Sequence, residues 1–200
     1  MNKPQTFIFI GRSGSGKGTQ IDLLKKYITD INPEIGTCSF VMGDTFRSFM
    51  KGEGYAQDAI RLIVNSGKLV PDSITNSLFI SELLNNLKSN EHLYIDGIPR
   101  SPLQAETVIE VIKFYDRYNP IIINIEVSKE VAEERMLARA RPDDTKEAIF
   151  ERVKFYDENI IPAIEVLKEK SGFIYMEING EKTPEEINVE LIDKLQPYFI

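Results

Sequence analysis

Short apolar runs alternate along the chain with longer stretches in which apolar side chains recur every three or four residues. The short runs, such as Phe7–Ile10 and Ile121–Ile123, lack a strict apolar–polar alternation, which is typical of strands buried on both faces. Strands that alternate with helices form a parallel sheet covered on both sides. The pattern predicts an α/β fold with a five-stranded parallel sheet flanked by helices, with strands at Thr6–Ile10, Ser39–Met42, Leu93–Ile95, Ile121–Val127 and Phe173–Ile178.

The clearest helical pattern lies near the carboxyl end of the chain, and Gly172 marks its end. Asp144, followed three residues later by Glu147, resembles a capping box and predicts the start of this helix. Pro162 lies inside the pattern, so we expect a kink there. The apolar positions at helical spacing are Ile149, Val153, Tyr156, Ile160, Ala163 and Leu167.

The stretch between the second and third predicted strands is too long for one crossover helix, and its turn signals divide it into short helices. We expect a small helical lobe at about residues 44–73, inserted into a core of residues 1–43 and 74–200. A chain of 200 residues that is 42% hydrophobic is long enough for one such domain. The turn signals are Gly43-Asp44, Gly52, Gly54, Gly67 and Pro71-Asp72.

Charge and composition exclude several classes of protein. The net charge is −7, whereas proteins that bind nucleic acid carry a basic excess. No apolar run approaches the roughly 20 residues that cross a bilayer, and residues 1–5 lead directly into the first strand without a signal peptide. We therefore expect a cytoplasmic monomer that binds neither nucleic acid nor membrane. A single cysteine, Cys38, excludes an internal disulfide; we expect it to be a buried strand thiol, and the lone His92 to be structural.

A glycine-rich loop, Gly11–Gln20, follows the first strand and precedes a helix. Glycines let a backbone curl so that several N–H groups point at phosphate oxygens, and a helix N-terminus adds partial positive charge. Lys17 has the spacing that reaches the β- and γ-phosphates of a nucleotide. A plain glycine turn is the alternative, but four glycines and a lysine at these spacings favour a phosphate-binding loop.

The loop departs from the general pattern at one position. A hydroxyl residue that binds Mg²⁺ normally follows the lysine, whereas here Gly18 follows Lys17 and the hydroxyl comes at Thr19. We expect Thr19 to contact the α-phosphate, and the metal to be held by ATP oxygens and water. Arg12 has no explanation in the pattern.

Six motifs in a fixed order make the sequence similar to the adenylate kinase family over nearly the whole chain. Six of the nine arginines fall on these motifs, although the protein is acidic overall. The resemblance implies a parallel sheet with a monophosphate-binding lobe after the second strand and a lid after the fourth. The motifs are the loop at 11–20, Gly43-Asp44-x-x-Arg47, Leu69-Val70-Pro71-Asp72, Asp96-Gly97-x-Pro99-Arg100, Glu134-Arg135-x-x-x-Arg139, and Arg141-x-Asp143-Asp144 with Arg152 beyond.

The resemblance implies reversible phosphoryl transfer from Mg·ATP to AMP, giving two ADP. Such transfer depends on holding two nucleotides in line and neutralising the transferring charge, and guanidinium groups suit that task. One carboxylate of Asp143-Asp144 would orient an arginine while the other caps the helix. By resemblance, the catalytic residues are Lys17, Arg100, Arg139, Arg141 and Arg152. The ATP-binding residues are Gly14, Ser15, Gly16, Lys17, Gly18, Thr19 and Arg135. The AMP-binding residues are Gly43, Asp44, Thr45, Arg47, Leu69, Val70, Gly97, Arg100 and Gln104, and Asp96 would organise the water shell of Mg²⁺.

Two side chains at the acceptor end favour different bases, so alternative acceptors stay open. Gln104 favours AMP, because an amide pairs in two places with the N6/N7 edge of adenine. Met42 stands where AMP-using relatives usually carry threonine, which leaves UMP or CMP as the alternative acceptor. A non-catalytic nucleotide sensor is the alternative of another class, although a sensor need not keep every phosphate-neutralising cation. A kinase for a non-nucleotide small molecule is disfavoured by the motifs at 43–47 and 69–72.

The lid is nearly absent in this chain, because only Ala140 separates Arg139 from Arg141. A lid normally closes over the phosphates and excludes water. We expect a lid reduced to about residues 139–142, and slow hydrolysis of ATP when the acceptor is missing.

Overall fold

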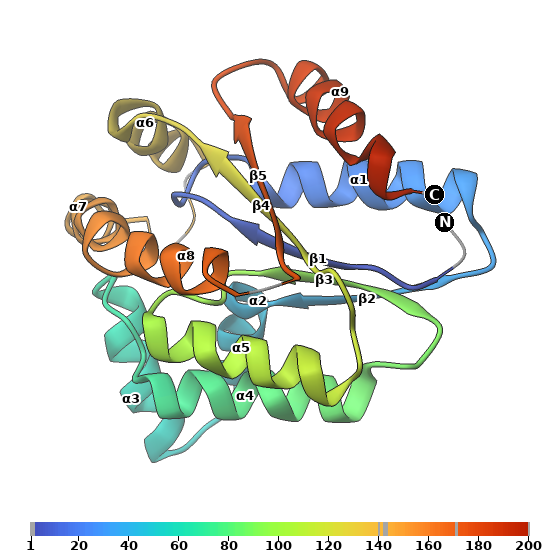
Figure 1. Ribbon diagram of the computed structural model, residues 1–200. Coiled ribbons are helices and arrows are strands. Elements are labelled where there is room, and N and C mark those ends of the chain that lie inside the picture. Colours follow the sequence, from blue (N-terminus) through green and yellow to red (C-terminus); the bar gives the residue numbers. More distant parts are fainter. Residues whose placement is uncertain (1–2, 140, 142–143, 171, 200) are drawn as a thin grey trace.

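A computed structural model describes residues 3–139, 141, 144–170 and 172–199. Its centre is a five-stranded sheet in the order β2-β3-β1-β4-β5, and every neighbouring pair is parallel. Helices cover both faces of the sheet (Figure 1), which confirms the predicted fold class. The strands are β1 (Thr6–Ile10), β2 (Gly36–Val41), β3 (Glu91–Asp96), β4 (Ile121–Glu126) and β5 (Ile174–Asn179).

The helices follow the strands in the alternation that the sequence predicts. Two of them, α2 and α3, fill the stretch between β2 and the long helix α4. The bounds are α1 (Lys17–Ile31), α2 (Met42–Phe49), α3 (Tyr55–Asn65), α4 (Asp72–Asn86), α5 (Pro102–Phe114), α6 (Lys129–Arg139), α7 (Lys146–Phe155), the π turn η1 (Tyr156–Ile160), α8 (Ile161–Lys168), α9 (Pro184–Leu195) and the short 3₁₀ turn η2 (Gln196–Tyr198).

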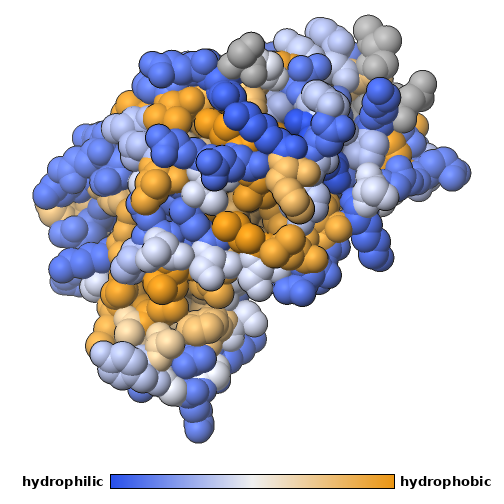
Figure 2. Space-filling view, turned by 60° about the horizontal axis from the view of Figure 1, so that its bottom comes forward, coloured by the Kyte–Doolittle hydropathy of each residue, from blue (hydrophilic) through white to orange (hydrophobic). Residues whose placement is uncertain are grey.

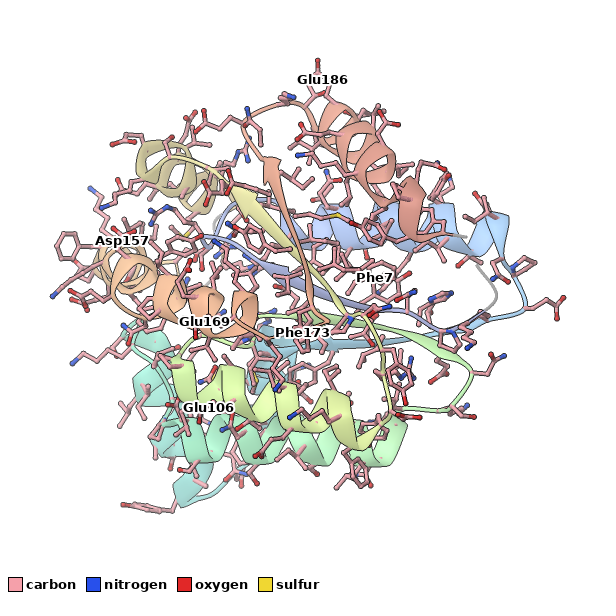
Figure 3. The ribbon with its side chains drawn as sticks, in the orientation of Figure 1. Phe7, Glu106, Asp157, Glu169, Phe173 and Glu186 are labelled. Carbon is pink, nitrogen blue, oxygen red and sulfur yellow. The ribbon has the colours of Figure 1, made fainter. Side chains whose placement is uncertain are left out.

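The core has two layers, one on each face of the sheet. On one face, alternate side chains of β1 and β4 pack against α1 and α9; Phe7 belongs to this layer and lies in the interior in Figure 3. On the other face, α4, α5 and α8 pack against Ile8, Ile10 and Ile95. All residues of β1 are buried, as expected of a central strand covered on both sides. This double burial explains the unbroken apolar runs Phe7–Ile10 and Ile121–Ile123.

The second strand differs from its prediction because it lies at the edge of the sheet. It covers Gly36–Val41 and is mostly exposed, so the apolar run gave too short a strand. Met42, predicted to end the strand, is the buried first residue of α2. Cys38 is half-buried rather than buried, because an edge strand has a neighbour on one side only.

The helical pattern after residue 144 is confirmed, but its start and its interruption differ from the prediction. Thr145 is the N-cap of α7, and its hydroxyl accepts a hydrogen bond from the amide of Ala148 at 3.1 Å. The capping box predicted at Asp144 is therefore wrong. At Pro162 the helix does not simply bend: a π turn, η1, precedes it and joins α7 to α8. Proline lacks the N–H of a regular α-helical bond, which fits an altered turn before it.

His92 is structural, as predicted. It is fully buried on β3, and its Nδ1 accepts a hydrogen bond from the amide of Gln5 at 3.0 Å. Burial lowers the pKa of His92 to about 4, so the ring is neutral at physiological pH.

Apolar side chains also reach the surface on the face formed by α3, α4 and α5. Figure 2 turns this lower part of the molecule forward and shows its apolar areas interrupted by polar ones. Scattered apolar exposure of this kind is normal on protein surfaces. The exposed side chains here are Leu62, Ile74, Ile80, Leu84 and Leu103. Within the described residues, no helix has the length and hydropathy required to span a membrane.

Candidate functional site

A cavity of about 540 Å³ opens where β1, β2 and β3 end. Open parallel sheets bind ligands at this edge, outside the carboxyl ends of their strands. The cavity wall combines the glycine loop, α1, α2, the start of α5, α6 and α7. Of the residues predicted for the site, only Ser15 and Thr45 are not in the wall. Those in the wall are Gly14, Gly16, Lys17, Gly18, Thr19, Gly43, Asp44, Arg47, Leu69, Val70, Asp96, Gly97, Arg100, Gln104, Arg135, Arg139, Arg141 and Arg152.

The two exceptions have other surroundings. Ser15 is fully buried, and its Oγ has no hydrogen-bond partner among the described residues. The hydroxyl of Thr45 donates to the carbonyl of Val41 at 3.3 Å, back along its own helix. The side chain of Thr45 therefore hydrogen-bonds to the start of its own helix and does not line the cavity.

The glycine loop turns into α1 through left-handed backbone conformations. Gly16, with a φ of 93°, precedes the first residue of α1 and supplies no side chain that would cap the helix. Gly14, with a φ of 87°, packs so closely on α6 that a Cβ there would lie 2.7 Å from the carbonyl oxygen of Ala132. The first turn of α1 contains no acidic residue, so its free N–H groups and its dipole remain available to an anion.

Lys17 is held by the loop itself. Its Nζ donates to the carbonyl oxygens of Gly11 and Arg12, each at 2.9 Å. Burial lowers the pKa of Lys17 to about 8. Asp96 opposes this shift, whereas Arg100, Arg139 and Arg141 add to it. Lys17 is thus surrounded by other cations, and an anionic ligand would offset the repulsion between them.

Asp144 binds two of the predicted catalytic arginines. Its side chain is fully buried and accepts from Arg139 Nε at 2.7 Å and from Arg152 Nη1 at 2.6 Å. Burial alone would raise the pKa of Asp144, but hydrogen bonding to Arg139 and the nearby Arg152 lower it below its usual value. The carboxylate that orients arginines is thus Asp144, the residue predicted to cap the helix. Asp143, as well as Ala140 and Pro142 of the predicted lid, lies outside the described residues.

Arg100 and Asp96 face each other across the loop after β3. Burial lowers the pKa of Arg100, and the charge of Asp96 opposes that shift. Gly97, with a φ of 82°, lies between them, and a Cβ there would be 3.1 Å from Cβ of Met42 and 3.4 Å from Nη2 of Arg100. A side chain at this position would press against Met42 and would be strained at this positive φ, so the loop after β3 favours glycine here.

Asp96 presents one carboxylate oxygen to the cavity without a protein partner. Its Oδ1 is buried and has no hydrogen bond among the described residues. A buried carboxylate oxygen normally has a partner, so this atom is suited to a water molecule or a hydrated cation. No group of three or more histidine, cysteine, aspartate and glutamate side chains gathers anywhere in the described part of the chain.

At the other end of the cavity, Arg47 lies over the first turn of α2. Its Nη2 pairs with Asp44 at 2.5 Å, and 38% of the side chain is exposed. Gly43 leaves room for the guanidinium, because a Cβ there would lie 3.2 Å from both terminal nitrogens. The Arg47 side chain is therefore more accessible than that of Arg152, which is 12% exposed.

Gln104 is fixed by a network that joins the N-termini of α4 and α5. Its Oε1 accepts from the amide of Arg100 at 2.8 Å, and its Nε2 donates to Asp72 at 2.7 Å. Ser101 donates to the second oxygen of Asp72 at 2.9 Å and caps α5. The amide nitrogen of Gln104 can donate one further hydrogen bond, and its oxygen can accept one. The side chain is therefore able to pair with a base bound in the cavity.

Arg135 lies one turn before Arg139 on α6, and both side chains line the cavity. The Nη1 of Arg135 donates to the carbonyl of Gly180 at 2.8 Å, which holds the guanidinium at the mouth near the loop after β5.

Sequence reasoning missed a wall of the cavity. Asp22 and Lys25 of α1 line it, and their spacing from Gly18 places all three on one face of the helix. This helical spacing could have predicted that Asp22 and Lys25 line the same cavity as Gly18. Apolar side chains from the segments around α2 and α3 join Met42 at the acceptor end, and the sequence reasoning did not single them out: Val41, Phe46 and Val64.

The fold and the site together define a class. A glycine loop follows a central parallel strand and leads into an uncapped helix, and several arginines converge opposite it. This chain is a nucleotide-binding protein of the P-loop class, with a second arginine-lined end in the same cavity.

Comparisons with known proteins narrow the class to one family. The adenylate kinase family profile matches residues 9–172. The chain is 34% identical to an adenylate kinase of Corynebacterium aurimucosum over 91% of its own length and 94% of the relative. It is 31% identical to adenylate kinase 1 of a Nostoc species (92% and 95%) and 32% identical to an adenylate kinase of Prochlorococcus marinus (94% and 97%). The chain belongs to the adenylate kinase family and is a nucleoside-monophosphate kinase.

Proposed function

We propose that this protein transfers a phosphoryl group reversibly between Mg·ATP and AMP, giving two ADP. One observation carries the proposal: Lys17, Arg100 and the arginines bound by Asp144 line a single cavity, with the glycine loop at one end and Arg47 at the other. Two anionic tails that meet between these cations would bring donor and acceptor phosphates together. Holding reactants in this way supplies much of the rate enhancement of phosphoryl transfer.

The donor binds at the glycine loop in this proposal. Backbone N–H groups of the loop and of the first turn of α1 would hold the phosphates, and Lys17 would exchange its carbonyl partners for phosphate oxygens. Thr19 lines the same part of the cavity and would contact the α-phosphate. Arg135, held by the carbonyl of Gly180, would lie against the donor base.

The transferring phosphoryl group would lie among Arg139, Arg141 and Arg152. Because Asp144 orients two of these side chains before any ligand binds, their charge is in place as negative charge develops. Preorganised charge of this kind is the main source of electrostatic catalysis.

The acceptor monophosphate would lie between Arg47 and Arg100. Its base would enter the end lined by Leu69, Val70 and Gln104. The amide of Gln104, its orientation fixed by Asp72, would then use its remaining donor and acceptor on the base edge.

Mg²⁺ would accompany ATP, and Asp96 fits it. The unpartnered Oδ1 of Asp96 would accept from water of the hydrated ion. The metal would neutralise phosphate charge, and the protein contributes one carboxylate, acting through water.

A second acceptor, UMP or CMP, is kept as an alternative because of Met42. This side chain is buried at the acceptor end, in contact distance of Gly97, and offers a base no conventional hydrogen-bond donor. A panel of AMP, UMP, CMP and deoxynucleotides with a coupled ADP assay separates the two acceptors, since only the true acceptor gives rapid ADP formation at micromolar concentration.

A single incubation tests the proposed reaction. The protein and Mg²⁺ are mixed with ADP alone, and nucleotides are separated over time. The proposal requires equal amounts of AMP and ATP to appear. Formation of AMP and free phosphate would indicate hydrolysis instead, and unchanged ADP that nevertheless binds would support the nucleotide sensor.

A further inference from the structure

Arg12 is the one charged residue inside the glycine loop, ahead of Lys17, that the proposed reaction does not use. Its side chain is only 14% exposed, although the loop lies at the protein surface. The guanidinium points away from the cavity and is not among its lining residues. A buried cation at this place requires an explanation, since unpaired burial of charge is costly.

The guanidinium of Arg12 binds the helical run that follows α7. Its Nη2 pairs with Oδ1 of Asp157 at 2.8 Å, and its Nη1 lies 3.5 Å from the carbonyl of Val153. The group also stacks over the ring of Tyr156, 4.2 Å from the ring centre. An ion pair and a cation–π contact together hold Arg12 in one orientation. Figure 3 shows Asp157 on this run, at the end of the molecule where the strands finish.

The main chain of Arg12 holds the loop. Its carbonyl oxygen accepts from Nζ of Lys17 at 2.9 Å and from the amide of Ser15 at 3.0 Å. One residue therefore joins two structures: its carbonyl positions Lys17, and its side chain is fixed to the α7–η1 run.

The same helical run carries Arg152. Arg152 and Val153 lie in the last turn of α7, and Tyr156 and Asp157 begin the π turn η1 one turn later. Tyr156 is buried, and its hydroxyl lies 3.4 Å from Oδ1 of Asn124 on β4, the neighbour of β1. A π turn adds a residue to a helical turn and often occurs at functional sites. Here it presents a ring and a carboxylate to Arg12 while Arg152 faces the cavity.

We propose that Arg12 is a positioning residue: it clamps the phosphate loop to η1 and so fixes Lys17 relative to Arg152. The inference rests on the proposed phosphoryl transfer and adds to it a role outside the cavity. Loss of the clamp would let the loop and the helix move relative to each other, and displacements of about 1 Å cost on the order of 100-fold in rate. The effect would fall on kcat and on the KM for ATP, since Arg47 and Gln104 do not depend on Arg12.

The test compares R12A, R12K and D157N in the ATP-plus-AMP reaction. We expect R12A to lower kcat about 10- to 100-fold and to raise the KM for ATP, with the KM for AMP unchanged. R12K keeps the charge but loses the planar stacking and should recover part of the rate. D157N should act in the same direction as R12A, and the double variant should be no worse than R12A alone, because both changes remove the same contact.

Two control variants separate this role from ordinary stabilisation. Lys168 makes the same pair of contacts elsewhere, 4.2 Å above the ring of Tyr175 and 3.0 Å from Glu165, so K168A should change the melting temperature comparably but leave both KM values alone. K129A removes the other partner of Asp157, at 2.6 Å, and leaves Arg12 in place. It should retain most of the activity.

The outcomes distinguish this inference from the proposed reaction. A wild-type protein that transfers phosphate to no monophosphate would overturn the proposed function; the affinity of R12A for ATP would then decide the inference, because unchanged ATP binding would overturn the clamp. An active wild type with R12A at full kcat, or with D157N faster than wild type, would overturn the clamp. A change in the KM for AMP without a change in the KM for ATP would also contradict the clamp.

Discussion

The donor and acceptor ends of the cavity are built in different ways. At the donor end, Lys17 is held by two main-chain carbonyls, and the arginines beside it are fixed by a fully buried carboxylate. At the acceptor end, Arg47 is held by one exposed carboxylate of its own helix, and Gln104 depends on Asp72 from another element. The phosphate loop at the donor end is thus a feature of the local chain, while the arginines opposite it and the base-binding part of the acceptor end are assembled from separate elements.

Because of this difference, the donor end recognises phosphate and the acceptor end selects the base. Phosphate is the same group in every nucleotide, so backbone N–H groups and fixed cations recognise it without regard to the base. The base is recognised by side chains whose orientation depends on neighbours. Changes at the donor end should therefore affect catalysis for every acceptor, and changes at the acceptor end should affect the choice of acceptor.

The largest effect is expected from K17M. Removing the only lysine held within the loop should lower kcat about 1,000-fold or more with every monophosphate. Burial disfavours the charged form of Lys17 in the free protein, so the ligand-free variant should melt no earlier than wild type. Steady-state kinetics and thermal unfolding check both. K182M, at an exposed lysine paired with Glu190, is the control; a K17M rate near that of K182M would contradict the donor assignment.

A smaller loss, about 100-fold in kcat, is expected from D144N, because Arg139 and Arg152 lose their shared carboxylate. The lowered pKa of Asp144 also gives stability that is present above about pH 4, the unfolded value. That contribution is lost as the pH falls through the lower folded value. Acid unfolding followed by circular dichroism should show wild type losing its advantage over D144N below pH 4. Equal advantage at pH 3 and pH 7 would show that the carboxylate is not stabilised by its arginines.

Q104A tests the acceptor end alone. We expect the KM for AMP to rise about tenfold, the cost of one or two lost hydrogen bonds, while the KM for ATP stays the same. Q196A removes an amide that donates to the hydroxyl of Tyr27, away from the cavity, and serves as the control. An equal rise in both KM values would indicate that the two ends are not separable.

The pH dependence of ATP binding sharpens the comparison further. Since the pKa of Lys17 in the free protein is about 8, ATP affinity should fall by up to about tenfold for each pH unit above 8, as the neutral amine ceases to pair with phosphate. Stability of the free protein should change in the opposite sense: between pH 8 and ~10.4 the unfolded state binds the extra proton, so stability rises. Calorimetric titration of ATP at pH 7 to 10 measures the first effect, and AMP should show a weaker dependence.

The smallest effect concerns water at the donor end. α6 ends at Arg139 and α7 begins at Lys146, so the connection between these two helices is short. We expect slow hydrolysis of ATP without acceptor, at a few per cent or less of the transfer rate, because a closing lid normally excludes water. Phosphate release with and without AMP measures it, and no detectable release would show that the site excludes water without a long lid.

The sequence by itself determined the parts that local chemistry dictates. Apolar runs gave the central strands, because β1 and β4 are buried on both faces, and the glycines around Lys17 gave a phosphate loop, because left-handed backbone at Gly14 and Gly16 is encoded residue by residue. The order of the motifs gave the family. The helix after residue 144 could also be predicted, because its apolar positions keep their helical spacing through the π turn.

Only the tertiary structure decided which side chains share a partner. Asp144 was expected to cap a helix, yet it lies buried between two arginines, and Thr145 takes the cap. Edge position left β2 and Cys38 more exposed than their apolar run suggested. Arg12 fits no motif because its partners lie more than 140 residues away. Periodicity and propensity describe neighbours along the chain, whereas burial and pairing depend on which distant segments the sheet brings together.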